Sequence, residues 1–111
     1  MNETHEKKEK VLPYIKSSFK IILAVADDNL ADTFMNALNP FGYYTVRVHS
    51  GKDALQAIET TKPDLIICDV DMPEMSGLLL LRTIKKDPSL ADIPFVLITA
   101  PENMNEKLRG G

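Results

Sequence analysis

The chain has little that would support disulfides, membrane insertion or binding to polyanions. Cys68 is its only cysteine, so neither an intrachain disulfide nor a cluster of cysteine metal ligands can form. No segment reaches the roughly 18 apolar residues of a membrane span, and the charged residues 1–10 lack the apolar core of a signal peptide. The formal net charge of -3 provides no overall attraction for nucleic acid or an anionic membrane. These absences predict a cytoplasmic protein with neither kind of partner.

The composition is that of one globular domain. A chain of 111 residues can build a single hydrophobic core but not two. Hydrophobic residues make up 44% and charged residues 26%, unlike a disordered chain. Residues 1–19 are mostly polar and mixed in charge, with Pro13 near their end, which indicates an arm or linker. The folded domain is therefore predicted to occupy residues 20–111.

Four segments have the pattern of β-strands. Residues 20–26, 64–69 and 93–99 are nearly continuous apolar runs, which are typical of strands buried on both faces of a sheet. In residues 43–49, apolar side chains alternate with polar ones such as Arg47, which indicates a half-exposed strand. This last segment is therefore predicted to lie at an edge of the sheet.

Helical spacing separates the four strands. Residues 30–39 carry apolar side chains at intervals of four, and Ser50 is the predicted N-cap of a second helix. A third helix is predicted from residue 78 onward, and a short fourth one within residues 101–111. The alternating order of strands and helices favours an α/β fold, a doubly wound parallel sheet with helices on both faces.

Carboxylates follow two of the buried strands. Asp27 and Asp28 follow the first strand, Asp69 ends the third, and Thr99 ends the fourth. The carboxyl ends of parallel strands meet at one edge of a sheet, where ligands bind, so these side chains are expected to form one pocket. Clustered carboxylates raise one another's pKa unless a cation neutralises them, and oxygen donors suit Mg²⁺ better than zinc. The sequence therefore predicts a magnesium site.

Each of these residues also has a purely structural interpretation. Acidic pairs after strands are often helix N-caps, and for Asp27 and Asp28 taken alone this interpretation is favoured. The presence of Asp69 at the end of another strand favours a shared site instead. The side chain of Asp71 is expected to form a turn and to point to solvent. His49 has no second ligand at metal spacing and is expected to be a solvated surface residue.

The segments VADDN, IICDVDMPEMSG and FVLITA together resemble the receiver domains of bacterial two-component response regulators. The resemblance runs from about Lys20 to the C-terminus, and the D-x-D-M-P-x-M-x-G segment is highly specific when an Asp pair precedes it. It implies a flavodoxin-like fold with a strand order that begins 2-1-3-4. It also implies a signalling module that is not an enzyme, because it assists only its own phosphorylation and dephosphorylation.

The same resemblance implies a role for each residue at the predicted site. Asp69 matches the position that accepts a phosphoryl group. Asp28 would bind Mg²⁺ directly, Asp27 mainly through water, and the backbone carbonyl of Asp71 would complete the protein ligands together with Asp69. Thr99 matches the hydroxyl residue that is drawn toward the phosphoryl group on activation. The implied partner is a sensor histidine kinase or a phosphotransfer protein.

Receiver domains continue into a fifth strand and a fifth helix, for which residues 100–111 leave no room. The resemblance therefore predicts a receiver that is incomplete at its C-terminus, with strand order 2-1-3-4 and no counterpart of the family's lysine. A fourth strand with one open edge leaves self-association through residues 93–99 open.

Two other functions compete with the phosphoacceptor. The DVD segment, Asp69 to Asp71, could be the nucleophile motif of haloacid-dehalogenase-like phosphatases. However, that motif is expected on a first strand and before Gly-Thr, whereas Met72 and Pro73 follow here. The second alternative is a truncated receiver that is no longer phosphorylated and serves as a protein-interaction module.

Overall fold

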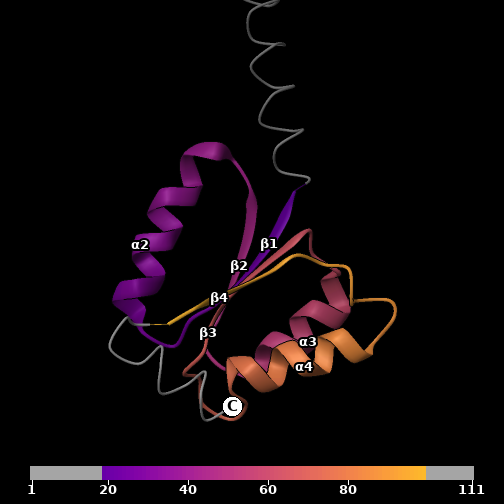
Figure 1. Cartoon of the computed structure of the whole chain (residues 1–111). Coiled ribbons are helices and arrows are strands. Elements are labelled where there is room, and N and C mark those ends of the chain that lie inside the picture. The colour runs from indigo at the N-terminus through magenta and orange to yellow at the C-terminus, as the bar shows by residue number, and fades with distance from the viewer. Residues whose placement is uncertain (1–18, 100–111) are drawn as a thin grey trace, which may run out of the picture.

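The computed structural model describes residues 19–99 of the chain, and Figure 1 shows how the elements are arranged. In chain order they are β1 (Lys20–Ala24), α2 (Asp28–Leu38), the short 3-10 helix η1 (Asn39–Phe41), β2 (Tyr44–Val48), α3 (Gly51–Thr61), β3 (Leu65–Asp69), α4 (Gly77–Lys86) and β4 (Phe95–Ile98). The helix expected within residues 101–111, and nearly all of the predicted arm, lie outside the described residues.

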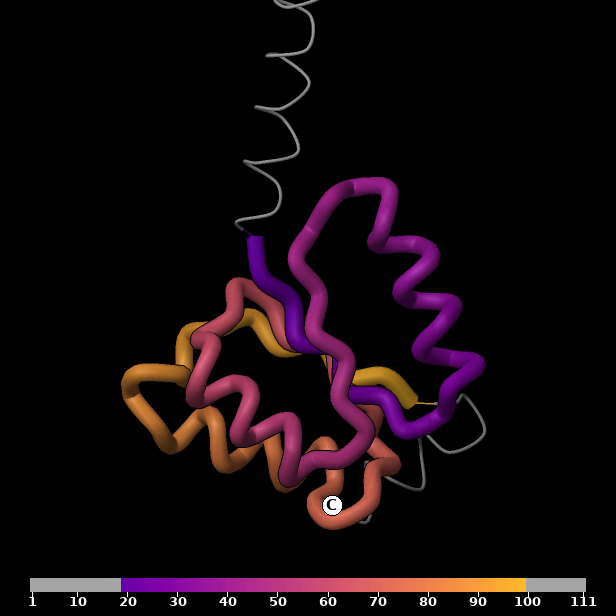
Figure 2. The backbone as a smooth tube through the Cα atoms, turned by 180° about the vertical axis from the view of Figure 1, so that it is seen from behind, coloured from indigo at the N-terminus to yellow at the C-terminus, as the bar shows by residue number. Residues whose placement is uncertain are grey.

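The four strands form one parallel sheet in the order β2-β1-β3-β4, which confirms the predicted fold class and strand order. Seen from behind in Figure 2, β1 runs between β2 and the rest of the sheet. In register, Ala24 of β1 lies opposite Cys68 of β3, and Asp69 lies opposite Ile98 of β4. The carboxyl ends of β1, β3 and β4 therefore lie beside one another.

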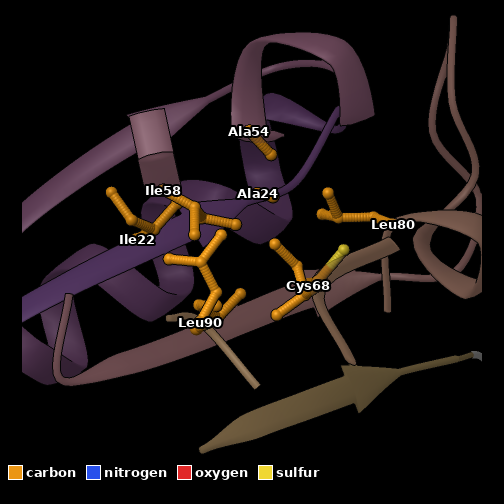
Figure 3. Packing of buried hydrophobic residues seen from close by; sticks show 9 residues of the cluster. Ile22, Ala24, Ala54, Ile58, Cys68, Leu80 and Leu90 are labelled. Atoms are coloured by element: carbon orange, nitrogen blue, oxygen red, sulfur yellow. The ribbon is translucent and has the colours of Figure 1, made fainter. Parts of the chain in front are cut away.

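Helices cover both faces of this sheet, with α2 on one face and α3 and α4 on the other (Figure 1). The side chains of β1 alternate between two hydrophobic clusters, because successive residues of a strand point to opposite faces. Ile22 belongs to the cluster under α3 and α4, with Ile58 and Leu90 (Figure 3). Its neighbour Leu23 belongs to the cluster under α2, with Ala31.

Polar side chains cap the three α-helices found between residues 19 and 99 at their N-termini. Asp27 accepts a hydrogen bond from the N–H of Asn29 at 2.8 Å, so the N-cap interpretation of this residue is correct as far as the fold is concerned. The predicted cap Ser50 accepts from the N–H of Asp53 at 3.0 Å. Ser76 caps α4 in the same way, which the sequence analysis did not foresee.

The alternation predicted for β2 holds only in part. This strand does lie at one edge of the sheet, and Val46 and Val48 pack against the cluster under α3 and α4. Tyr44, on the same face, is 54% exposed, because it is the first residue of β2 and lies beyond that cluster. On the opposite face Arg47 is mostly buried, with a side chain that is 19% exposed. The expectation of a solvated polar face was therefore wrong for Arg47.

Between residues 19 and 99, no helix is long and apolar enough to cross a membrane.

Cys68 is the only cysteine, and it is fully buried in β3. Burial, together with the nearby charge of Asp69, raises the pKa of its thiol to about 12, and the thiol donates a hydrogen bond to the backbone oxygen of Asp69. We expect Cys68 to resist iodoacetamide at neutral pH in the folded protein and to react once urea unfolds it, because the thiolate is the reactive form. Equal alkylation rates with and without urea, measured by mass spectrometry, would contradict this burial.

Candidate functional site

The predicted site residues gather at the carboxyl edge of the sheet. Asp69 is the last residue of β3, and Thr99 directly follows β4, whose Ile98 pairs with Asp69. Asp27 and Asp28 lie where the β1 segment turns into α2. The topology therefore places at one edge of the sheet four residues that are up to 72 positions apart in the sequence (Asp27 to Thr99).

Asp69 is half-buried at the end of a strand that is otherwise covered by helices. Burial raises the pKa of its carboxyl group, the backbone N–H groups of Asp71 and Val70 lower it in part, and the carboxylates of Asp71 and Asp27 raise it further. The N–H of Asp71 donates to Oδ1 of Asp69 at 3.1 Å. The net result is a pKa above the ordinary value, as expected for a poorly solvated carboxylate with acidic neighbours.

The two acids after β1 behave differently from each other. Asp27 caps α2 and lies close enough to Asp69 to influence its pKa. Asp28 is 78% exposed, and its Oδ1 forms an ion pair with Nη2 of Arg47 at 3.0 Å. Nε2 of His49 lies 3.8 Å from the same oxygen. The sequence analysis missed both basic partners, because they come from β2 and from the residue that follows it.

The loop between β3 and α4 is held in place by main-chain contacts. The N–H of Gly51 donates to the carbonyl of Pro73 at 3.3 Å, and the N–H of Gly77 donates to that of Val70 at 2.9 Å. Glu74 adopts a left-handed conformation with φ of 70°, which turns the chain back toward α4. A Cβ on Gly51 would collide with the backbone oxygen of Met75, so this contact between α3 and the loop requires glycine. The predicted metal-ligating carbonyl of Asp71 therefore lies in a fixed loop.

Thr99 carries a hydroxyl group that has no hydrogen-bond partner among residues 19–99. Its Oγ1 is buried, and no donor or acceptor within the described part of the chain reaches it. A buried hydroxyl without a partner is unfavourable and is uncommon in folded proteins. Among residues 19–99, this hydroxyl therefore has unused hydrogen-bonding capacity at the end of the strand that pairs with β3.

The residues of this edge suit a divalent cation chemically, although they do not yet enclose one. Carboxylate and carbonyl oxygens are the ligands that Mg²⁺ prefers, and a cation would offset the repulsion that Asp27 and Asp71 exert on Asp69. In residues 19–99, no three acidic, histidine or cysteine side chains stand in a metal-binding group. Oδ1 of Asp28 is engaged by Arg47, so a cation at this oxygen would have to compete with the guanidinium.

Comparison with known proteins gives one consistent result at the level of sequence. Residues 22–110 match the family model of the response regulator receiver domain. The chain is 35% identical over 95 residues to the polar-differentiation response regulator DivK of Brucella ovis, an alignment that covers 83% of this chain and 77% of the relative. The DivK of Brucella anthropi is 34% identical over 95 residues, and the alignment covers the same shares of the two chains.

Solved structures agree with this match. The N-terminal domain of a response regulator receiver protein from Methanoculleus marisnigri superposes with a TM-score of 0.68 at 34% identity, over 78% of this chain and 74% of the other. The signal receiver domain of a signal transduction histidine kinase from Syntrophus aciditrophicus superposes with a TM-score of 0.69 at 35% identity. This match covers 83% of this chain and 72% of the other. The parallel sheet and its covering helices are thus an arrangement that these proteins share with this chain.

Proposed function

This chain belongs to the response regulator receiver domain family of two-component signalling, and we propose that it accepts a phosphoryl group on Asp69. The observation that supports the proposal best is the position of Asp69, which ends a buried strand beside other carboxylates and has a raised pKa. Thr99, one residue beyond the strand that pairs with Asp69, adds a buried hydroxyl group that has no partner in the described part of the chain. A phosphoryl group on Asp69 would give that hydroxyl an acceptor.

The proposed transfer begins with attack by a carboxylate oxygen of Asp69 on phosphorus. As the new O–P bond forms, the bond between phosphorus and the donor breaks, and the donor leaves with the electron pair. A phosphohistidine donor releases its imidazole, and acetyl phosphate releases acetate. The product is an acyl phosphate on Asp69, and the N–H of Asp71, which already donates to this carboxyl group, helps to orient it.

Mg²⁺ would be held by the carboxylates of Asp27, Asp28 and Asp69 and by the backbone carbonyl of Asp71, with Asp27 acting mainly through water. A bound ion at these residues would supply positive charge that offsets the negative charge of the carboxylates and of the incoming phosphoryl group. The hydroxyl of Thr99 would donate to a phosphoryl oxygen.

The proposed partner is a sensor histidine kinase or a phosphotransfer protein in the cytoplasm, with residues 20–111 as the receiver module. On this proposal the chain turns over no outside substrate. The phosphatase alternative is disfavoured. Its nucleophile motif is expected on a first strand, whereas Asp69 ends β3. Self-association through β4 stays a prediction. In the described sheet β4 pairs only with β3, and Val96 is 47% exposed.

Incubation of the full chain with acetyl phosphate tests the proposal. We expect the mass of one phosphoryl group to be added when Mg²⁺ is present, and the addition to be reversed by hydroxylamine, which cleaves acyl phosphates. Reduction with borohydride and peptide mapping should place the modification at Asp69. Chelation of Mg²⁺ should remove most of the labelling, because the charges of the site and the phosphoryl group are then uncompensated.

The same experiment separates the phosphoacceptor from a module that only binds other proteins. A second receiver domain, labelled in parallel, establishes that the donor is active. If this chain then acquires no label at any Mg²⁺ concentration, the phosphoacceptor proposal is wrong and the interaction module is favoured. Labelling at a residue other than Asp69 would also contradict it.

A further inference from the structure

Arg47 is fixed by the backbone at the end of β1. Its Nε and Nη2 donate to the carbonyl of Val25 at 3.1 and 2.9 Å, and Nη2 also reaches the carbonyl of Ala26 at 3.4 Å. In β2 this residue pairs with Leu23, so its side chain extends past the end of the neighbouring strand. A guanidinium group held by two or more acceptors in a mostly buried position has little freedom to move away.

The fixed guanidinium lies against one of the acids that the proposed metal site requires. Its Nη2 is 3.0 Å from Oδ1 of Asp28, and Nε2 of His49 is 3.8 Å from the same oxygen. Asp27 and Asp71 are the carboxylates that act on Asp69. Asp28 instead contacts Arg47 and His49, and no metal-binding group of three side chains is formed among the described residues.

We propose that Arg47 competes with the divalent cation for Asp28 and thereby sets the metal affinity of the acidic site. This inference rests on the proposed function, because it assumes that the cation binds at this edge. A cation that takes Oδ1 of Asp28 as a ligand has to replace the guanidinium, and one that takes the other oxygen has to tolerate the fixed positive charge nearby. Exposed ion pairs are weak, so the competition changes the affinity without abolishing it.

Two substitutions of Arg47 and one control separate charge from structure. In Arg47→Gln the competing charge is gone, and we expect Mg²⁺ to bind roughly two- to five-fold more tightly, the range set by the loss of one exposed ion pair. Arg47→Lys keeps the charge but not the forked contact, so a smaller gain is expected. Lys86→Gln, at the exposed C-terminal end of α4, makes the same change in net charge and should leave the affinity unchanged.

The measurement is a Mg²⁺ titration followed through the amide NMR signals of Asp27, Asp28 and Asp69. In the unmodified protein, the side-chain Nε signal of Arg47 should shift with the same midpoint, because Asp28 leaves the guanidinium as the ion binds. This second readout needs no variant and is independent of whether Arg47→Gln folds. Dispersed amide spectra confirm that each variant is folded before its affinity is compared.

The outcomes distinguish this inference from the proposed function. Suppose that the unmodified protein binds Mg²⁺, that Arg47→Gln binds it no more tightly, and that the Nε signal does not shift. The proposed competition for Asp28 is then wrong, while the proposed metal site is supported. Binding by Arg47→Gln alone would support the competition in its strongest form. If neither protein responds up to about tens of millimolar, the upper end for an open oxygen-ligand site, both the competition and the magnesium site are wrong.

Discussion

The substitution Asp69→Asn is expected to abolish labelling by acetyl phosphate and, at neutral pH, to make the domain more stable. An amide is not nucleophilic enough to attack phosphorus, so the loss of label should be complete. The gain in stability follows from the environment of Asp69, since burial and neighbouring carboxylates disfavour its charged form. Asparagine fills nearly the same volume without a charge. Because the group is only half-buried, the gain should be about 1 kcal/mol or less, which is a few degrees in Tm.

The pH dependence of this gain has a definite sign. The pKa of Asp69 is raised in the folded state, so at pH values between the unfolded and folded pKa the folded protein binds more protons than the unfolded one. The stability of the unmodified protein therefore falls as the pH rises through that window. The advantage of Asp69→Asn should be absent below the unfolded pKa and complete above the folded one. Added Mg²⁺ should reduce it, because the ion stabilises only the carboxylate form.

Thermal unfolding across a pH series measures this effect, with Asp32→Asn as the matched control. Asp32 is an exposed residue of α2, so the same chemical change there should alter stability by no more than about 0.5 kcal/mol and leave labelling intact. If Asp69→Asn were less stable than the unmodified protein at neutral pH, the carboxylate of Asp69 would be favourably placed. The account of its raised pKa would then be wrong.

The order and type of the elements followed from local pattern. Continuous apolar runs predicted β1 and β3, because strands buried on both faces have no polar side to alternate with. The ends of the strands were predicted less accurately. The fourth strand was predicted over residues 93–99, whereas β4 is Phe95–Ile98, because apolar residues also continue into the loops. The strand order came from the resemblance to receivers and not from the pattern of residues. The local pattern of apolar and polar residues does not reveal which strands pair.

The site was predictable to the extent that it depends on where strands end. Asp27, Asp69 and Thr99 lie at the same edge of the sheet, because each follows or ends a strand of one parallel sheet. The ion pair between Arg47 and Asp28 was not predictable, because it joins residues from two elements through a long side chain. In the sequence, Arg47 occupies one of the polar positions of an alternating strand. Its partners, two carbonyls and a carboxylate, become visible only once β2 lies beside β1.

A substitution of Gly77 tests the packing that supports this edge of the sheet. Gly77 is the first residue of α4, and its backbone lies directly against β3. A Cβ at this position would overlap the backbone oxygen of Asp69 and would lie 3.1 Å from Sγ of Cys68. Both atoms belong to a strand in the middle of the sheet, so neither can move without disturbing its neighbours. Gly77→Ala is therefore expected to displace α4 or the loop that carries Asp71.

We expect Gly77→Ala to lower the free energy of unfolding by roughly 2–3 kcal/mol, as overpacking against an immobile backbone does. Helix propensity alone predicts the opposite sign, because alanine favours a helix by about 1 kcal/mol over glycine. Urea unfolding decides between the two, with Leu79→Ala as the control. Leu79 lies two residues along the same helix and is 47% exposed, so its truncation should have a much smaller effect. A Gly77→Ala protein as stable as the original would show that α4 can shift away from β3, and the rigid loop inferred around Asp71 would have to be abandoned.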